Sequence, residues 1–116
     1  MGKLTTHILD TSFGKPAAGV YMELRRCGST DAVLMTGRSN ADGRGNQPLL
    51  EGDAFSPGEY ELTFYIGDYF RTLRTDLPEP PFLDKVVIRF GIAQADAHYH
   101  VPLLVSPWGY STYRGS

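Results

Sequence analysis

Apolar and polar residues alternate along most of this chain, in short runs separated by turn residues. In residues 20–25, valine, methionine and leucine alternate with tyrosine, glutamate and arginine, and in 58–66 every second residue from Tyr60 is again apolar. Successive side chains of a β-strand point to opposite faces, so a period of two predicts half-buried strands. The same pattern predicts further strands over 4–9, 32–38, 85–92, 97–105 and 109–115.

One helix interrupts this series of strands. Residues 68–74 contain neither glycine nor proline, and we expect a short helix there with Asp68 as its N-cap. The prolines at 78, 80 and 81 exclude regular structure before the next strand, because proline has no N–H group to donate. The residues at 10–16 predict a loop.

The segment Asn40-Ala41-Asp42-Gly43-Arg44 predicts a tight turn. Asparagine and aspartate side chains can bond to the nearby backbone, and glycine accepts a positive φ. Arg44 is therefore placed at the rim of a β-element. Without further information, an arginine after Asp-Gly is expected to be an ordinary solvated turn residue.

Short strands punctuated by 13 glycines and 8 prolines are typical of an all-β sandwich or barrel. The 116 residues suit one domain, 1–116, with enough chain to bury a core. We find no internal repeat that would indicate a second domain.

Composition excludes several classes of function. A net charge of -2 with scattered basic residues argues against nucleic-acid binding, which needs clustered Lys and Arg. No apolar stretch is long enough for a membrane span or a signal peptide. The single cysteine, Cys27, cannot form an intrachain disulfide, and we expect a reduced, cytoplasmic setting.

The candidate chemistry lies in three histidines, His7, His98 and His100, all in predicted strands. His98 and His100 are two residues apart and so share a face. Three imidazoles could also hold zinc with a water as fourth ligand, but no acidic residue nearby suggests a supporting role, and we predict no metal. A Gly-x-Ser-x-Gly motif and phosphate-binding glycine loops are absent from the sequence.

Three segments resemble the 5-hydroxyisourate hydrolases, the transthyretin-like enzymes of purine breakdown. They are "LTTHILDTSFGKPAAGVYMEL", "NADGR" and "HYHVPLLVSPWGYSTYRGS", and the resemblance covers nearly the whole chain. The final Tyr-Arg-Gly-Ser distinguishes these hydrolases from transthyretins, which share the preceding motif but end differently.

The resemblance implies a transthyretin-like two-sheet sandwich of seven to eight strands with one short helix, assembled as a homotetramer around a central channel. It also implies hydrolysis of 5-hydroxyisourate to 2-oxo-4-hydroxy-4-carboxy-5-ureidoimidazoline in urate degradation, without a cofactor. The terminal strand would lie at a subunit interface, where its last residues line the catalytic cleft instead of fraying.

By position, the resemblance assigns catalytic roles to His7, Arg44, His100 and Ser116. His7 and Arg44 would also contact substrate, together with Tyr113. Ser116 would support the histidines, and we expect His98 to be a structural neighbour without a chemical role. Imidazole titrates near neutral pH and suits either proton transfer, while the guanidinium of Arg44 can stabilise negative charge.

Two alternatives remain. A transthyretin-like binding module would carry a small ligand without catalysis, but such a site needs a mostly apolar lining and few ionisable groups. An immunoglobulin-like structural domain would be a monomer without activity.

Overall fold

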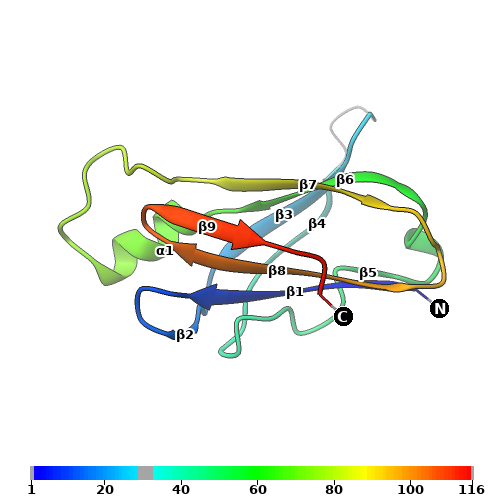
Figure 1. Cartoon of the computed structure of the whole chain (residues 1–116), viewed down its shortest axis with the longest axis horizontal. Coiled ribbons are helices and arrows are strands. Elements are labelled where there is room, and N and C mark those ends of the chain that lie inside the picture. Colours follow the sequence, from blue (N-terminus) through cyan, green and yellow to red (C-terminus); the bar gives the residue numbers. More distant parts are fainter. Residues whose placement is uncertain (1, 29–32, 116) are drawn as a thin grey trace.

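The computed structural model describes residues 2–28 and 33–115, which form a sandwich of two β-sheets (Figure 1). The first sheet has the order β2-β1-β8-β9, with β5 paired to β1 as well, and the second has the order β4-β3-β6-β7. The strands of the first sheet are β1 (Lys3–Asp10), β2 (Lys15–Pro16), β5 (Leu50–Glu51), β8 (His98–Ser106) and β9 (Gly109–Thr112). Those of the second are β3 (Tyr21–Arg26), β4 (Val33–Arg38), β6 (Gly58–Phe64) and β7 (Val86–Ile92). The helices are the 3₁₀ helix η1 (Gly52–Ala54) and α1 (Ile66–Leu73).

The predicted two-sheet sandwich with one short α-helix is confirmed. The described residues contain nine strands because β2 and β5, each of two residues, form in segments where no strand was predicted. The last predicted strand, 109–115, is shorter in the structure: β9 ends at Thr112, and the chain then returns to β8 through one isolated bridge at Gly115. Part of the predicted strand 32–38 falls on residue 32, outside the described residues.

The core lies between the two sheets, and the alternation in the sequence fills it. In β1, Leu4 and Ile8 are fully buried, while the odd-numbered residues between them, Thr5 and His7, are partly exposed. In β6, Leu62 and Phe64 are fully buried and face the same interior. Each fully buried aliphatic or aromatic side chain contributes about 1.5–3 kcal/mol, so the pattern also fixes the pairing register of the strands.

The helix α1 begins at Ile66, two residues before the predicted start, and the prediction of Asp68 as its N-cap is wrong. Tyr65 holds the N-cap position without a side-chain cap, and Asp68 lies in the first turn, where its carboxylate pairs with Arg71 at 2.6 Å. The N–H of Gly67 donates to the backbone oxygen of Asp84 at 2.7 Å. This tertiary bond, which no local pattern reveals, satisfies a helix-start donor in place of a cap.

The parallel pairing of β1 with β8 prepares the functional face. Its register sets Lys3 opposite His98, Thr5 opposite His100 and His7 opposite Pro102. Figure 1 shows these two strands side by side although they come from opposite ends of the sequence. Within the described residues, no helix has the length and apolar character needed to cross a membrane.

Candidate active site

The outer face of the first sheet brings together the three histidines. In β1 the even-numbered residues from Leu4 to Asp10 are buried, so Thr5 and His7 point away from the core. In β8, Tyr99 and Val101 are buried, so His98 and His100 point outward on the same side. The predicted shared face of His98 and His100 is therefore present in the structure, with β1 beside it.

Arg44 reaches this face through the turn that follows β4. The side-chain oxygen of Asn40 accepts hydrogen bonds from the backbone N–H groups of Asp42 and Arg44, at 2.9 and 3.1 Å. Gly43 has a φ of 75°, and its carbonyl accepts the N–H of Ile8 in β1 at 2.8 Å. The turn is thus docked on β1, and Arg44 forms an isolated bridge with His7. These contacts confirm the predicted turn and its mechanism.

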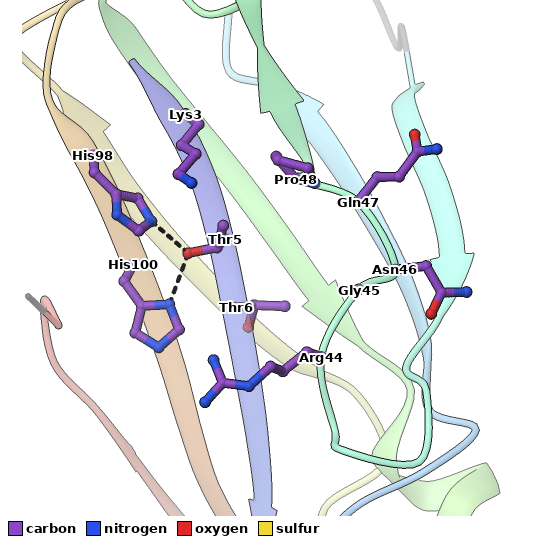
Figure 2. A pocket seen from close by; sticks show the side chains of 10 residues that line it. All are labelled: Lys3, Thr5, Thr6, Arg44, Gly45, Asn46, Gln47, Pro48, His98 and His100. Atoms are coloured by element: carbon purple, nitrogen blue, oxygen red, sulfur yellow. Dashed lines mark hydrogen bonds between the residues drawn. The ribbon is translucent and has the colours of Figure 1, made fainter. Parts of the chain in front are cut away.

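A cavity of about 320 Å³ opens between this turn and the two strands. Its lining includes Arg44, His98 and His100, with Thr5 and Lys3 from β1. Figure 2 shows the guanidinium of Arg44 directed toward the ring of His100 across β1. His7 is not part of the lining, but it lies close enough to disfavour the protonated form of His100 electrostatically.

The hydroxyl of Thr5 stands between the two histidines of β8. Its Oγ1 lies 2.8 Å from Nε2 of His98 and 2.8 Å from Nδ1 of His100 (Figure 2). Sequence reasoning did not single out Thr5. The only signal was its position two residues before His7, which places both on one face of a strand.

The environment of His100 favours its neutral form. Burial lowers the pKa of His100 below its usual 6.5, and the positive charge of Arg44 adds to the effect, followed by His98 and His7. Removal from water and nearby cations both disfavour an imidazolium. These surroundings favour the neutral imidazole of His100, which can accept a proton, next to a permanent positive charge.

The C-terminal segment lies along β8 instead of projecting into solvent. The N–H of Gly115 donates to the backbone oxygen of His100 at 2.8 Å. The guanidinium carbon of Arg114 lies 4.1 Å from the centre of the Tyr99 ring, and its Nη2 donates to the oxygen of His98 at 3.4 Å. Ser116 lies outside the described residues, so its predicted role stays a prediction.

Tyr113 is not brought together with Arg44 and His100 in the single chain. It is 61% exposed and lines a second cavity of about 250 Å³ that also touches Phe90 of β7 and Tyr99 of β8. Its neighbours Thr112 and Arg114 line this second cavity as well. The predicted substrate contact of Tyr113 finds no support in this geometry.

A zinc site would need at least three ligating side chains close together. Among residues 2–28 and 33–115, no three or more His, Cys, Asp or Glu side chains are grouped so that they could hold a metal ion. The rings of His98 and His100 are 6.3 Å apart, centre to centre, and the oxygen between them belongs to a threonine.

Comparison with known proteins points to one family. The model of the HIUase/transthyretin family matches residues 4–115. A 5-hydroxyisourate hydrolase of Mesorhizobium japonicum is 61% identical over 99% of this chain and 93% of its own length. The 5-hydroxyisourate hydrolase 2 of Rhizobium meliloti is 56% identical over 99% of this chain and 97% of its own length.

Solved structures show the same architecture. The 5-hydroxyisourate hydrolase of Klebsiella pneumoniae is 36% identical with a TM-score of 0.82, and the match covers 100% of both chains. A transthyretin of Sparus aurata is 26% identical with a TM-score of 0.84, over 97% of this chain and 96% of that one. An (S)-allantoin synthase is 46% identical with a TM-score of 0.93, and the match covers 99% of this chain but only 44% of that one.

Proposed function

The chain belongs to the HIUase/transthyretin family, and from that premise we infer that it is a 5-hydroxyisourate hydrolase acting in urate degradation. The observation that carries this conclusion is the polar cavity in which Arg44 faces the neutral imidazole of His100. A carrier of apolar ligands needs few converging ionisable groups, and this cavity holds several. The identity to two hydrolases, 56% and 61%, also exceeds the 26% to a transthyretin.

The reaction requires a base, an acid and a group that stabilises negative charge. One histidine removes a proton from water as the water oxygen attacks the ring carbonyl carbon of the substrate. The carbonyl π electrons move to oxygen, and the resulting tetrahedral oxyanion collapses with cleavage of the adjacent C–N bond. The departing nitrogen takes a proton from the protonated histidine, so the enzyme returns to its first state.

Arg44 suits the charge-stabilising role. Its planar guanidinium stays ionised at any working pH and offers several N–H donors, and its position over β1 directs these donors into the cavity. His100 is the better candidate for the base, because it lines the cavity and favours its neutral form. His7, bridged to Arg44 through the backbone, is assigned to orienting the substrate.

The direct test mixes the protein with urate and urate oxidase and follows the absorbance of 5-hydroxyisourate. Accelerated decay with the wild-type protein is expected. The variant His100→Asn should lower kcat by about a hundredfold or more, the range typical of a positioned acid or base. His7→Asn should lower kcat by about a hundredfold as well, because a substrate misplaced by about 1 Å can lose that much in rate. Circular dichroism would show that both variants are folded. If both retained nearly full activity, the assigned roles would be wrong.

We also propose a homotetramer. Within the described residues, β7 and β9 are each paired on one side only, and both strands or their flanks border the second cavity. A second copy could therefore extend both sheets at once, and the exposed Tyr110 and Tyr113 would supply apolar contact area. Sedimentation equilibrium would give the mass of a tetramer if this is correct and that of the 12.8 kDa chain if it is not.

Three finer assignments complete the proposal. Ser116 would support the histidines through its hydroxyl or carboxylate, because the bond from Gly115 brings the chain next to His100. Tyr113 would contact substrate only from an assembled subunit, since its side chain lines the second cavity. A cytoplasmic location agrees with the free thiol of Cys27, and cell fractionation would test it.

A further inference from the structure

The cavity contains a chain of three polar groups in which Thr5 connects two imidazoles. We propose that Thr5 and His98 are positioning residues that hold His100 as its Nδ1–H tautomer, so that Nε2 presents a lone pair to the substrate water. The proposal rests on the proposed function, because it explains how His100 acts as the base. It also gives His98 a part in the chemistry, where the sequence suggested only a structural neighbour.

The geometry defines two alternative arrangements. The Oγ1 of Thr5 lies 2.8 Å from both Nε2 of His98 and Nδ1 of His100, and a hydroxyl has one hydrogen to donate and two lone pairs to accept with. If Thr5 donates to His98, it accepts the Nδ1–H of His100, and Nε2 of His100 is free to take a proton. If Thr5 donates to Nδ1 of His100 instead, Nε2 carries the hydrogen and cannot act as a base.

The first arrangement also stabilises the charged state that catalysis creates. When His100 takes a proton from water, both of its ring nitrogens carry hydrogens, and Nδ1–H needs an acceptor. In serine hydrolases a buried aspartate fills this place. Among the described residues, no carboxylate lines this cavity, and its charged residues are the cations Lys3 and Arg44. Thr5 is the acceptor within reach of Nδ1.

His98 completes the arrangement by accepting a hydrogen bond from the hydroxyl of Thr5. In its neutral form with hydrogen on Nδ1, His98 has a lone pair on Nε2, the atom that faces Thr5. With that acceptor occupied, the hydroxyl of Thr5 is turned away from His100 and keeps a lone pair for it. The strand pairing makes this possible, because Thr5 is the direct partner of His100, and Lys3 of His98, across β1 and β8.

Nuclear magnetic resonance tests the tautomer without reference to activity. Nitrogen-15 spectra of the imidazoles, recorded near pH 8 where histidine is mostly neutral, should show the Nδ1–H form of His100 in the wild type. Thr5→Val removes the hydroxyl at nearly constant shape and should shift His100 toward the Nε2–H form, while Thr5→Ser should keep the wild-type pattern. An Nε2–H form in the wild type, or no change in Thr5→Val, would overturn the proposal.

Kinetics supply the second arm. We expect Thr5→Val to lower kcat by about tenfold or more with KM within about twofold, because Thr5 acts through His100, and Thr5→Ser should recover most of the loss. His98→Phe should act in the same direction, and the double variant should be no slower than Thr5→Val alone, as for residues that work as a unit. The proposal would be contradicted if the losses of kcat in the two single variants multiplied in the double variant, or if KM rose while kcat stayed unchanged. A wild-type protein without hydrolytic activity would refute the proposed function instead, and the tautomer would still be measured.

Discussion

Gly115 lies directly against the imidazole of His100, and replacing it with alanine should disturb the active site. A Cβ atom built on Gly115 would lie 2.5 Å from Cδ2 of His100 and 3.1 Å from its Cγ. Carbon atoms in contact are usually about 3.5–4.0 Å apart. Either the ring or the C-terminal segment must therefore move by about 1 Å.

Both movements remove an interaction that positions His100. Rotation of the ring breaks its 2.8 Å hydrogen bond to Thr5, and displacement of the segment breaks the 2.8 Å bond from Gly115 to the backbone oxygen of His100. A misplacement of about 1 Å can cost about a hundredfold in rate. The loss of one hydrogen bond costs about 1 kcal/mol of stability, so Gly115→Ala should be nearly inactive and still folded.

The assay follows 5-hydroxyisourate released by urate oxidase, with urea denaturation as the measure of stability. Gly37→Ala is the matched control: a Cβ on Gly37 in β4 meets no heavy atom within 4 Å, and we expect its kcat to match the wild type. A Gly115→Ala protein with kcat within about twofold of the wild type would show that the close approach of the tail to His100 has no functional consequence.

Four further outcomes are expected. Arg44→Gln should raise the pKa of His100 toward 6.5, because the charge of Arg44 is the largest cause of the lowered pKa after burial. A titration followed by proton magnetic resonance would measure this pKa. Arg38→Gln, on the opposite sheet, is the control and should leave the pKa of His100 unchanged. Because folded His100 holds its proton less tightly than unfolded His100, the wild type should lose stability as pH falls below about 6.5, and Arg44→Gln should lose less. Tyr69→Phe should lower the free energy of unfolding by about 2 kcal/mol in urea denaturation, because it removes a 2.8 Å hydrogen bond to the fully buried carboxylate of Asp10. Tyr21→Phe, on an outer face, is the control and should change the free energy of unfolding by less than about 0.5 kcal/mol. Deleting residues 113–116 should abolish turnover and leave the far-ultraviolet circular dichroism intact, and retained turnover would remove the tail from the site.

Local sequence predicted the features that local forces determine. Alternation located β1, β3, β6 and β7, because each of them has one face in the core. The Asn-Ala-Asp-Gly segment predicted the turn that carries Arg44, because the turn is held by its own backbone bonds. The two-residue strands β2 and β5 carry too few residues for a period to appear. The start of α1 was misplaced because a bond to Asp84, a distant residue, satisfies its first turn.

The proposed catalytic face could be predicted from the sequence only in part. The spacing of two residues predicted that His98 and His100 share one side of a strand. The catalytic roles of His7 and Arg44 were predicted from the resemblance to a known family. The proposed role of Thr5 depends on the parallel register between β1 and β8, which no neighbouring residue encodes. The contact of His98 with Thr5 depends on the same register, so the sequence alone could not predict it.

The pairing of β1 with β8 also determines when activity can arise during synthesis. The hydrogen bonds between Thr5 and the two imidazoles span 93 and 95 residues of chain, and at about 5–20 residues per second a ribosome needs roughly 5–20 s to translate that distance. A nascent polypeptide that has not passed β8 holds no assembled cavity. Translation arrested before β8 thus leaves a fragment that cannot consume the substrate.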